Sequence, residues 1–121
     1  MAIIGLDHVQ IAIPAGGEDQ ARGFYAGLLG LEEVAKPATL SPAGCWFVSG
    51  QVQIHLGIDP AFRAATKAHP ALLVDDLDGL RLQLEAAGCV TRDDKPIAGY
   101  RRFFTDDPFG NRIELMERIL G

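Results

Sequence analysis

All three histidines of the chain lie in short segments where apolar residues flank the histidine or alternate with polar residues, as they do in half-buried strands. They are His8, His55 and His69, and Glu114 occupies a comparable place between Ile113 and Leu115. Successive side chains of a strand point to opposite faces, so these four residues would lie on the faces opposite their apolar neighbours. Three imidazoles and a carboxylate suit Zn, Ni, Mn, Co or ferrous iron. The pattern therefore predicts one divalent metal ion per site.

A single histidine on a strand is more often an ordinary core or surface residue than a ligand, so the prediction depends on the joint pattern. His8 and His69 are separated by 61 positions, and His55 and Glu114 by 59. The helical patterns that follow the first and third histidines fall in the same register. We therefore predict an internal repeat, with modules over residues 1–58 and 66–121 of a single domain that spans residues 1–121.

Hydrophobic periodicity and turn residues predict the same order of elements in both halves. Gly30 and Gly88 stand where the two helices would end, and Asp75 or Asp76 would cap the second helix. Residues 91–96 read as a polar loop. The predicted helices cover residues 19–29 and about 77–87, and the predicted strands cover residues 6–13, 45–48, 51–56, 69–74, 100–105 and 112–116.

With two or three strands after each helix, this order predicts an α+β fold of two βαβββ modules. Each module has too few strands to close a barrel alone, so we expect the two to form an eight-stranded, cup-like mixed β-sheet with both helices outside. If the ligand-bearing faces of the two modules are opposed, His8, His55, His69 and Glu114 would lie close together.

Composition narrows the classes of function. The 121 residues are 48% hydrophobic and carry a net charge of -5, so nucleic acid is an unsuitable partner. No apolar run is long enough to cross a membrane, and no secretory signal pattern is present, which indicates a cytoplasmic protein. Cys45 and Cys89 lack metal-binding or disulfide-type spacing and read as reduced thiols in or near the core.

Several basic and aromatic residues are candidates for binding a small-molecule substrate. The cations form two groups that could hold an anionic metabolite, although each of them could equally be solvated surface charge. Trp46 and Tyr100 are candidate apolar walls, and Gln10 follows the first histidine on the same face. The predicted substrate-binding residues are Gln10, Trp46, Arg63, Lys67, Tyr100, Arg101 and Arg102.

The sequence resembles the vicinal oxygen chelate (VOC) superfamily, which includes glyoxalases, bleomycin-resistance proteins, fosfomycin-resistance transferases, methylmalonyl-CoA epimerases and extradiol dioxygenases. The resemblance covers essentially the whole chain and is specific for the fold but weak for the reaction. The segments that carry it are Gly5-Leu6-Asp7-His8-Val9, Phe24-Tyr25, Leu29-Gly30-Leu31, Ile54-His55-Leu56, His69 with Leu73-Val74-Asp75-Asp76-Leu77, and Asp107-Pro108-Phe109-Gly110-Asn111 with Ile113-Glu114-Leu115.

The resemblance implies that His8, His69 and Glu114 are the usual metal ligands and that Glu114 or His55 could act as a general base. His55 stands where glyoxalases carry a fourth ligand that is usually acidic or a glutamine, which places lactoylglutathione lyase activity in doubt. Gln10 replaces the threonine that fosfomycin transferases use. The resemblance also implies a homodimer.

Three functions follow from the resemblance. The first is a metal-dependent, glyoxalase-type lyase, isomerase or transferase acting on a small, oxygen-chelating, anionic metabolite. The second is a ferrous extradiol-type dioxygenase. The third is a non-catalytic, bleomycin-resistance-like drug-binding protein, which would need no metal ligands.

Overall fold

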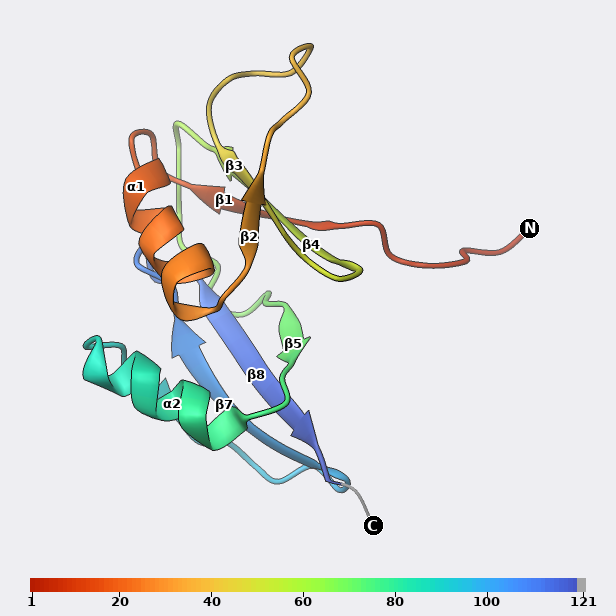
Figure 1. Ribbon diagram of the computed structural model, residues 1–121, viewed down its shortest axis with the longest axis vertical. Helices are drawn as coiled ribbons and strands as arrows, with labels where there is room; N and C mark the ends of the chain where they lie inside the picture. Colours follow the sequence, from red (N-terminus) through yellow and green to blue (C-terminus); the bar gives the residue numbers. More distant parts are fainter. Residues whose placement is uncertain (120–121) are drawn as a thin grey trace. The chain divides into compact units, whose positions relative to one another are not determined.

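The computed structural model describes residues 1–119 of the chain. The chain divides into two units, Met1–Arg63 and Ala64–Gly121, which we call module 1 and module 2. Each module carries one helical segment and one four-stranded sheet (Figure 1). Within residues 1–119, no helix is long and apolar enough to span a bilayer.

Module 1 has the order strand, helical segment, then three strands. In its sheet the strands lie in the order β1-β4-β3-β2, with β1 parallel to β4 and the other neighbours antiparallel. The elements are β1 (Val9–Ile13), α1 (Glu18–Ala21), η1 (Arg22–Leu28), β2 (Glu32–Val34), β3 (Cys45–Ser49) and β4 (Val52–Ile58).

The helical segment of module 1 changes from an α-helix to a π-helical turn at Arg22. The amide of Leu29 donates to the carbonyl of Phe24, five residues back. Phe24 and Tyr25 are buried, and the Tyr25 ring packs against the ring of Phe47 on β3 with centroids 5.8 Å apart. This segment therefore covers the face of the sheet that carries Phe47. Side chains alternate along a strand, so Trp46, the neighbour of Phe47, points to the other face.

Module 2 repeats this order. Its sheet has the order β5-β8-β7-β6, again with the first strand parallel to the last and the other neighbours antiparallel. As predicted, Asp76 caps the helix, because its carboxylate accepts a hydrogen bond from the amide of Gly79 at 3.0 Å. The elements are β5 (Ala71–Leu73), α2 (Leu77–Ala86), β6 (Thr91–Arg92), β7 (Tyr100–Asp106) and β8 (Arg112–Arg118).

The turn before β8 holds the start of module 2 against this strand. The buried carboxylate of Asp107 accepts hydrogen bonds from the amides of Phe109 and Asn111 and from the Asn111 side chain, each at 2.9 Å. The Asn111 side-chain oxygen accepts from the amide of Ala65 at 2.9 Å. Glu114 N donates to the carbonyl of Pro70 at 3.0 Å. These bonds bring the segment that contains His69 alongside β8.

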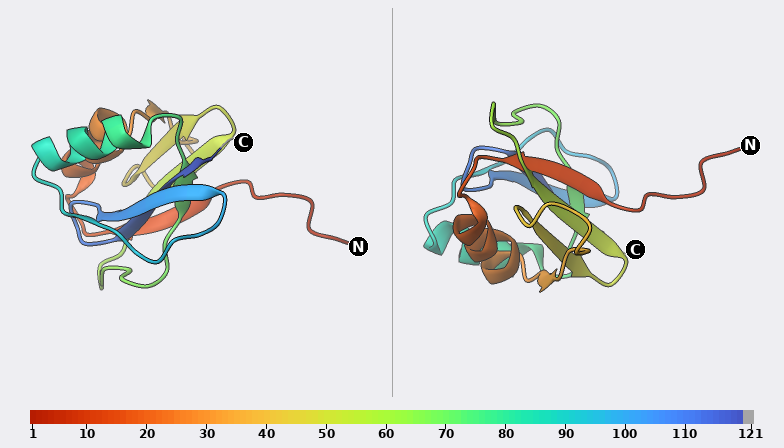
Figure 2. Two further views of the ribbon diagram at one scale, coloured as in Figure 1. Left: turned by 90° about the horizontal axis from the view of Figure 1, so that it is seen from below. Right: turned by 90° about the horizontal axis from the view of Figure 1, so that it is seen from above.

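The predicted fold of two βαβββ modules, each with a mixed sheet, is confirmed. Closure into one eight-stranded sheet stays a prediction. The elements differ most from the predictions in the segments that begin at Leu6, His69 and Thr91. The strand expected from Leu6 begins at Val9, whose register partner is Ile54, and the chain before it runs outward from module 1 as an arm (Figure 2).

The strand expected from His69 begins at Ala71, because Pro70 has no amide hydrogen for a ladder bond. Thr91 and Arg92, expected in a loop, form β6 by pairing with Thr105 and Phe104. Strand β2 was not predicted, because three residues carry no visible period.

The two cysteines are unpaired thiols, as predicted. Cys45 is buried and Cys89 is half-buried. Burial raises the pKa of both thiols, so they stay protonated and unreactive at neutral pH.

Gly44 lies immediately before β3, the strand that carries Trp46, and its role can be tested by substitution. Its φ is +87°, and a Cβ at this position would lie 2.2 Å from the carbonyl oxygen of Leu56 on β4. We expect Gly44→Ala to lower the free energy of unfolding by about 3 kcal/mol, because the strained backbone and the collision with main-chain atoms add together. Gly99→Ala is the control, since Gly99 has a φ of +84° with open space around it, and it should cost about 1 kcal/mol. Urea unfolding measures the free energy of unfolding of both variants. Equal losses of stability in the two variants would contradict the steric explanation.

Candidate functional site

In module 1, His55 lies between two other aromatic rings. It is only 4% exposed. The Trp46 ring stacks on one side with centroids 3.8 Å apart and planes at 7°, and the His8 ring stacks at 4.1 Å and 16°. In the sheet, His55 is the register partner of both Trp46 and Gln10. Four residues predicted for the site therefore lie together in module 1.

The surroundings of His55 keep its imidazole neutral. Burial lowers the pKa of His55, and the nearby His8 lowers it further. Its Nε2 lies 3.3 Å from the Gln53 side-chain oxygen. The Asp7 carboxylate accepts a hydrogen bond from Nδ1 of His8 at 2.8 Å. A neutral His55 has a free lone pair that can bind a metal or accept a proton.

In module 2, His69 and Glu114 face each other directly. Nε2 of His69 lies 2.9 Å from Oε1 of Glu114, whose side chain is 8% exposed. The carbonyl of Lys67 accepts a hydrogen bond from Nδ1 of His69 at 2.8 Å. A carbonyl can only accept, so Nδ1 carries a proton and the remaining nitrogen, Nε2, is the one directed at Glu114.

Arg102 holds the second oxygen of Glu114. Its Nη1 donates to Oε2 at 3.2 Å, and its Nη2 donates to the carbonyl of Lys95 at 2.6 Å. The Arg102 guanidinium also lies 5.3 Å from the ring of Phe104, the register partner of Glu114. The buried carboxylate is thus compensated by a guanidinium on one oxygen and by an imidazole on the other.

The two modules place these pairs at equivalent positions. In module 1, the residue two after His8 is the register partner of His55. In module 2, the residue two after His69, Ala71, is the register partner of Glu114. The same backbone arrangement therefore presents two imidazoles in one module and an imidazole with a carboxylate in the other.

The donor atoms are suited to a divalent cation. Two donors bound to one ion at about 2.1 Å and at a right angle lie about 3 Å apart, and Nε2 of His69 and Oε1 of Glu114 are separated by 2.9 Å. In this structure the two atoms form a hydrogen bond. Across the described part of the chain, no three His, Cys, Asp or Glu side chains gather into a metal-binding group. Each module thus presents one pair of candidate donors.

The other predicted substrate-binding residues are dispersed. Arg101 points to the opposite face of β7 from Arg102, and its guanidinium donates to both carboxylate oxygens of the exposed Asp78. Tyr100 lines a cavity of about 240 Å³ in module 2, together with Arg101 and Arg102. Arg63 and Lys67 are exposed residues of the segment between β4 and β5.

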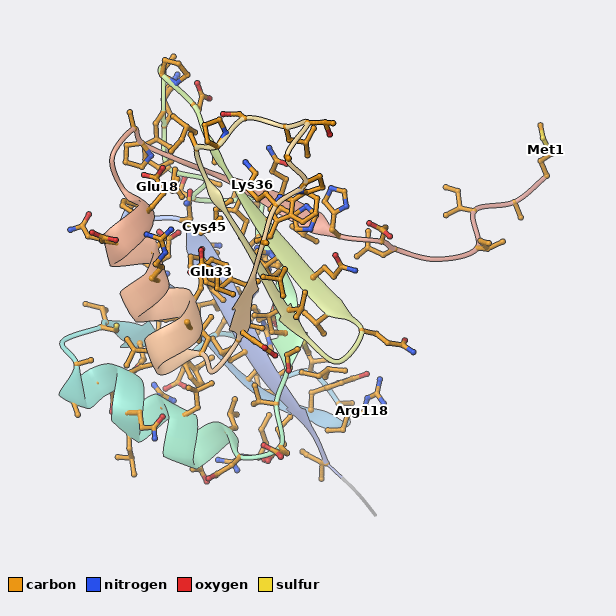
Figure 3. The ribbon with its side chains drawn as sticks, turned by 45° about the horizontal axis from the view of Figure 1, so that its top comes forward. Met1, Glu18, Glu33, Lys36, Cys45 and Arg118 are labelled. Atoms are coloured by element: carbon orange, nitrogen blue, oxygen red, sulfur yellow. The ribbon has the colours of Figure 1, made fainter. Side chains whose placement is uncertain are left out.

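A larger cavity in module 1, of about 480 Å³, contains none of the predicted site residues. Glu33, Lys36 and Cys45 are among the residues that line it, and Figure 3 labels them near the helical segment. Arg22, which also lines it, is already paired with Asp19 and Glu33.

Sequence reasoning missed two neighbours of the candidate ligands. Phe104 contacts His69 edge-on, with ring centroids 5.2 Å apart. Asp7 orients His8. Phe104 was not singled out because it follows another phenylalanine, and the sequence does not show which of the two lies beside His69. Asp7 could have been noticed as a carboxylate adjacent to a candidate ligand.

The contact between Arg102 and Glu114 can be tested without metal. We expect Arg102→Met to lower the free energy of unfolding by about 3 kcal/mol, because it leaves a buried carboxylate without its guanidinium. In a Glu114→Gln background the same change should cost much less. Chemical unfolding of the four proteins in a chelating buffer gives the coupling free energy. Arg101→Met is the matched control and should leave stability nearly unchanged. If Arg102→Met lowers the free energy of unfolding equally with Glu114 and with Gln at position 114, the contact is refuted.

Comparisons with known proteins agree with this architecture. A glyoxalase family protein from Bacillus anthracis is 43% identical, with 98% of each chain covered and a TM-score of 0.92. A mutant form of the fosfomycin resistance protein FosX from Listeria monocytogenes, complexed with Mn(II) and 1S,2S-dihydroxypropylphosphonic acid, is 19% identical. The match covers 98% of this chain and 95% of that one, with a TM-score of 0.79.

TnmS3, an antibiotic-binding protein from Streptomyces sp. CB03234, is 22% identical over 98% of this chain and 99% of that one, with a TM-score of 0.72. At these identities, FosX and TnmS3 show similarity of fold alone. A comparison with curated protein sequences finds no match. The family model for the Glyoxalase/Bleomycin resistance protein/Dioxygenase superfamily matches residues 5–115, and the chain therefore belongs to that superfamily.

Proposed function

We propose that the protein is a metal-dependent, glyoxalase-type enzyme that acts on a small, oxygen-chelating, anionic metabolite as a lyase, isomerase or transferase. One divalent ion per site would be held by His8, His69 and Glu114, with His55 as a fourth ligand or as a general base. The two modules that share an ion could belong to one chain or to two.

The observation that carries this proposal is the oriented pair of His69 and Glu114. Nδ1 of His69 is held by a carbonyl, and Oε2 of Glu114 is held by Arg102, so Nε2 and Oε1 are the atoms left facing each other. Hydrogen bonds of this kind orient metal ligands in proteins. A drug-binding protein without a metal has no need of such a pair.

A bound divalent ion would polarise two neighbouring substrate oxygens and stabilise negative charge that develops on them. The neutral imidazole of His55 could accept a proton from the substrate if it stays off the metal. Trp46 and Gln10, its register partners, would then form the adjacent wall of the site.

Metal binding is the direct test. We expect Glu114→Ala to lose the ion almost completely, because the remaining imidazoles lack the charge of the carboxylate. His55→Ala should weaken binding by only about 10- to 100-fold. Calorimetric titration with Zn(II), Mn(II) and Co(II) measures both. Glu117→Ala is the control, since Glu117 lies on the same strand and pairs with Arg101 instead.

Undiminished binding by Glu114→Ala, or no binding by the parent protein, would rule out the proposed site. Elemental analysis of the purified protein separates the remaining alternatives. Iron would favour an extradiol-type dioxygenase, nickel, zinc or manganese would favour the proposed enzyme, and a protein that takes up no metal would be a drug-binding protein.

We further propose that the protein is a homodimer, as the resemblance implies. The N-terminal arm, residues 1–6, supports this: it runs outward from module 1, and Figure 3 labels Met1 at its end. Met1, Ile3, Ile4 and Leu6 are between 80% and 129% exposed. Contiguous exposed apolar side chains of this size mark interaction sites.

The arm can be tested by sedimentation. We expect the parent protein to sediment at twice the chain mass of 13.0 kDa at micromolar concentration. The double substitution Ile3→Ser and Ile4→Ser should raise the dissociation constant at least about tenfold, because each Ile then buries less apolar surface. Leu82→Ser, at an exposed position of α2, should have no effect. A parent mass near 13.0 kDa would contradict the proposal.

A further inference from the structure

We propose that Arg112 binds the anionic group of the substrate. This inference rests on the proposed function and adds to it a residue that sequence reasoning did not single out. Arg112 opens β8 and lies two positions before Glu114. Because side chains alternate along a strand, both residues occupy the same face, with Cα atoms roughly 7 Å apart.

Arg112 is close to the same aromatic ring as the candidate ligand of module 2. Its guanidinium lies 5.2 Å from the centroid of Phe104, and the His69 ring contacts Phe104 at 5.2 Å. A guanidinium over an aromatic face is held in a defined direction while its terminal nitrogens stay available. A substrate of only a few carbon atoms could therefore reach both Arg112 and an ion at Glu114.

Three other arginines of module 2 already have carboxylate partners. Arg81 pairs with Asp93, Arg101 pairs with Asp78, and Arg102 pairs with Glu114. Asp106 is the register partner of Arg112, but its two oxygens accept hydrogen bonds from Arg92 at 2.8 and 2.9 Å. The carboxylate opposite Arg112 in the sheet, that of Asp106, is thus already paired with another arginine.

Arg112 itself has no such partner. Among residues 1–119 it forms no ion pair, and its Nε is buried without a hydrogen-bond partner. The Nε of Arg102 is also unpartnered, but the terminal nitrogens of Arg102 donate to Glu114 and Lys95. Buried polar groups in proteins are nearly always satisfied, so the Arg112 guanidinium, which has no such partner among the described residues, can bind an anionic partner from outside the module. A planar guanidinium matches a carboxylate, phosphate or phosphonate, with which it forms two parallel hydrogen bonds.

This assignment separates the roles of the basic residues. Arg102, expected from the sequence to bind substrate, is occupied by Glu114 and Lys95, and Arg101 lies on the opposite face of β7. Arg112 binds the negatively charged group of the substrate, and the ion would bind the vicinal oxygens of the substrate.

The test uses two probes that share the same chelating 2-hydroxycarboxylate group and differ by one further carboxylate. Lactate and malate are both 2-hydroxy acids, and malate carries an additional carboxylate in place of a hydrogen of the lactate methyl group. Dissociation constants for both are measured by calorimetry on Co(II)-loaded protein. We expect the parent protein to bind malate about tenfold more tightly than lactate, a difference typical of one charge-assisted contact.

In Arg112→Met this preference should disappear while Co(II) content and lactate affinity stay the same. Arg112→Lys should keep part of it. The matched control is Arg118→Met, which removes the same charge from the far end of β8, labelled in Figure 3, and should keep the preference in full.

Malate preference that survives Arg112→Met, equal loss in Arg118→Met, or no preference in the parent would each overturn the assignment. A parent protein that takes up no Co(II) would instead overturn the proposed metal site, and the role of Arg112 with it. The Co(II) content of each variant, measured first, distinguishes the two failures.

Discussion

The burial of one negative charge is the constraint on which module 2 depends. Glu114 lies on a central strand between Ile113 and Leu115, both almost completely buried. A carboxylate in such a place is unfavourable unless it is compensated, and the compensation comes from outside its own strand. Arg102 reaches it from β7, and His69 reaches it from the segment before β5. The buried turn at Asp107 and Asn111 holds that segment in place.

Module 1 has the same strand order as module 2 but buries an uncharged group at the equivalent position. The residue at the equivalent position, His55, is buried as a neutral ring, and aromatic stacking by Trp46 and His8 stabilises it. Burial therefore has opposite consequences in the two modules. In module 1 it removes charge from an imidazole, and in module 2 it demands a cation beside a carboxylate. In the proposed function, the imidazoles of module 1 and the carboxylate–imidazole pair of module 2 would be complementary contributions to one divalent-metal site.

The repeat, the helices and most strands could be predicted because hydrophobic period and turn residues are local signals. The helix cap at Asp76 is an example. The first residues of the strands expected from Leu6 and His69 could not be predicted. Pairing of β1 with β4 begins only at Val9, although the alternating pattern starts earlier, and Pro70 lacks an amide hydrogen. Strand β6 was hidden because its residues are polar, and only pairing with Thr105 and Phe104 makes it a strand.

For the site, alternation along the strands predicted which side chains share a face, but it could not predict partners. Arg101 and Arg102 looked equivalent in the sequence. Their roles differ because adjacent residues of β7 point to opposite faces, one toward Asp78 and the other toward Glu114. Phe104 gained its place beside His69 from the register of β7 with β8, which has no sequence signal of its own.

The central claim is that His8, His69 and Glu114 bind one divalent ion. X-ray absorption spectroscopy at the cobalt edge of the Co(II)-loaded protein tests it most directly, because the scattering counts imidazole ligands. We expect at least two imidazoles and one carboxylate oxygen per ion, with one imidazole lost in His69→Ala. A spectrum of oxygen donors alone, unchanged in that variant, would contradict it.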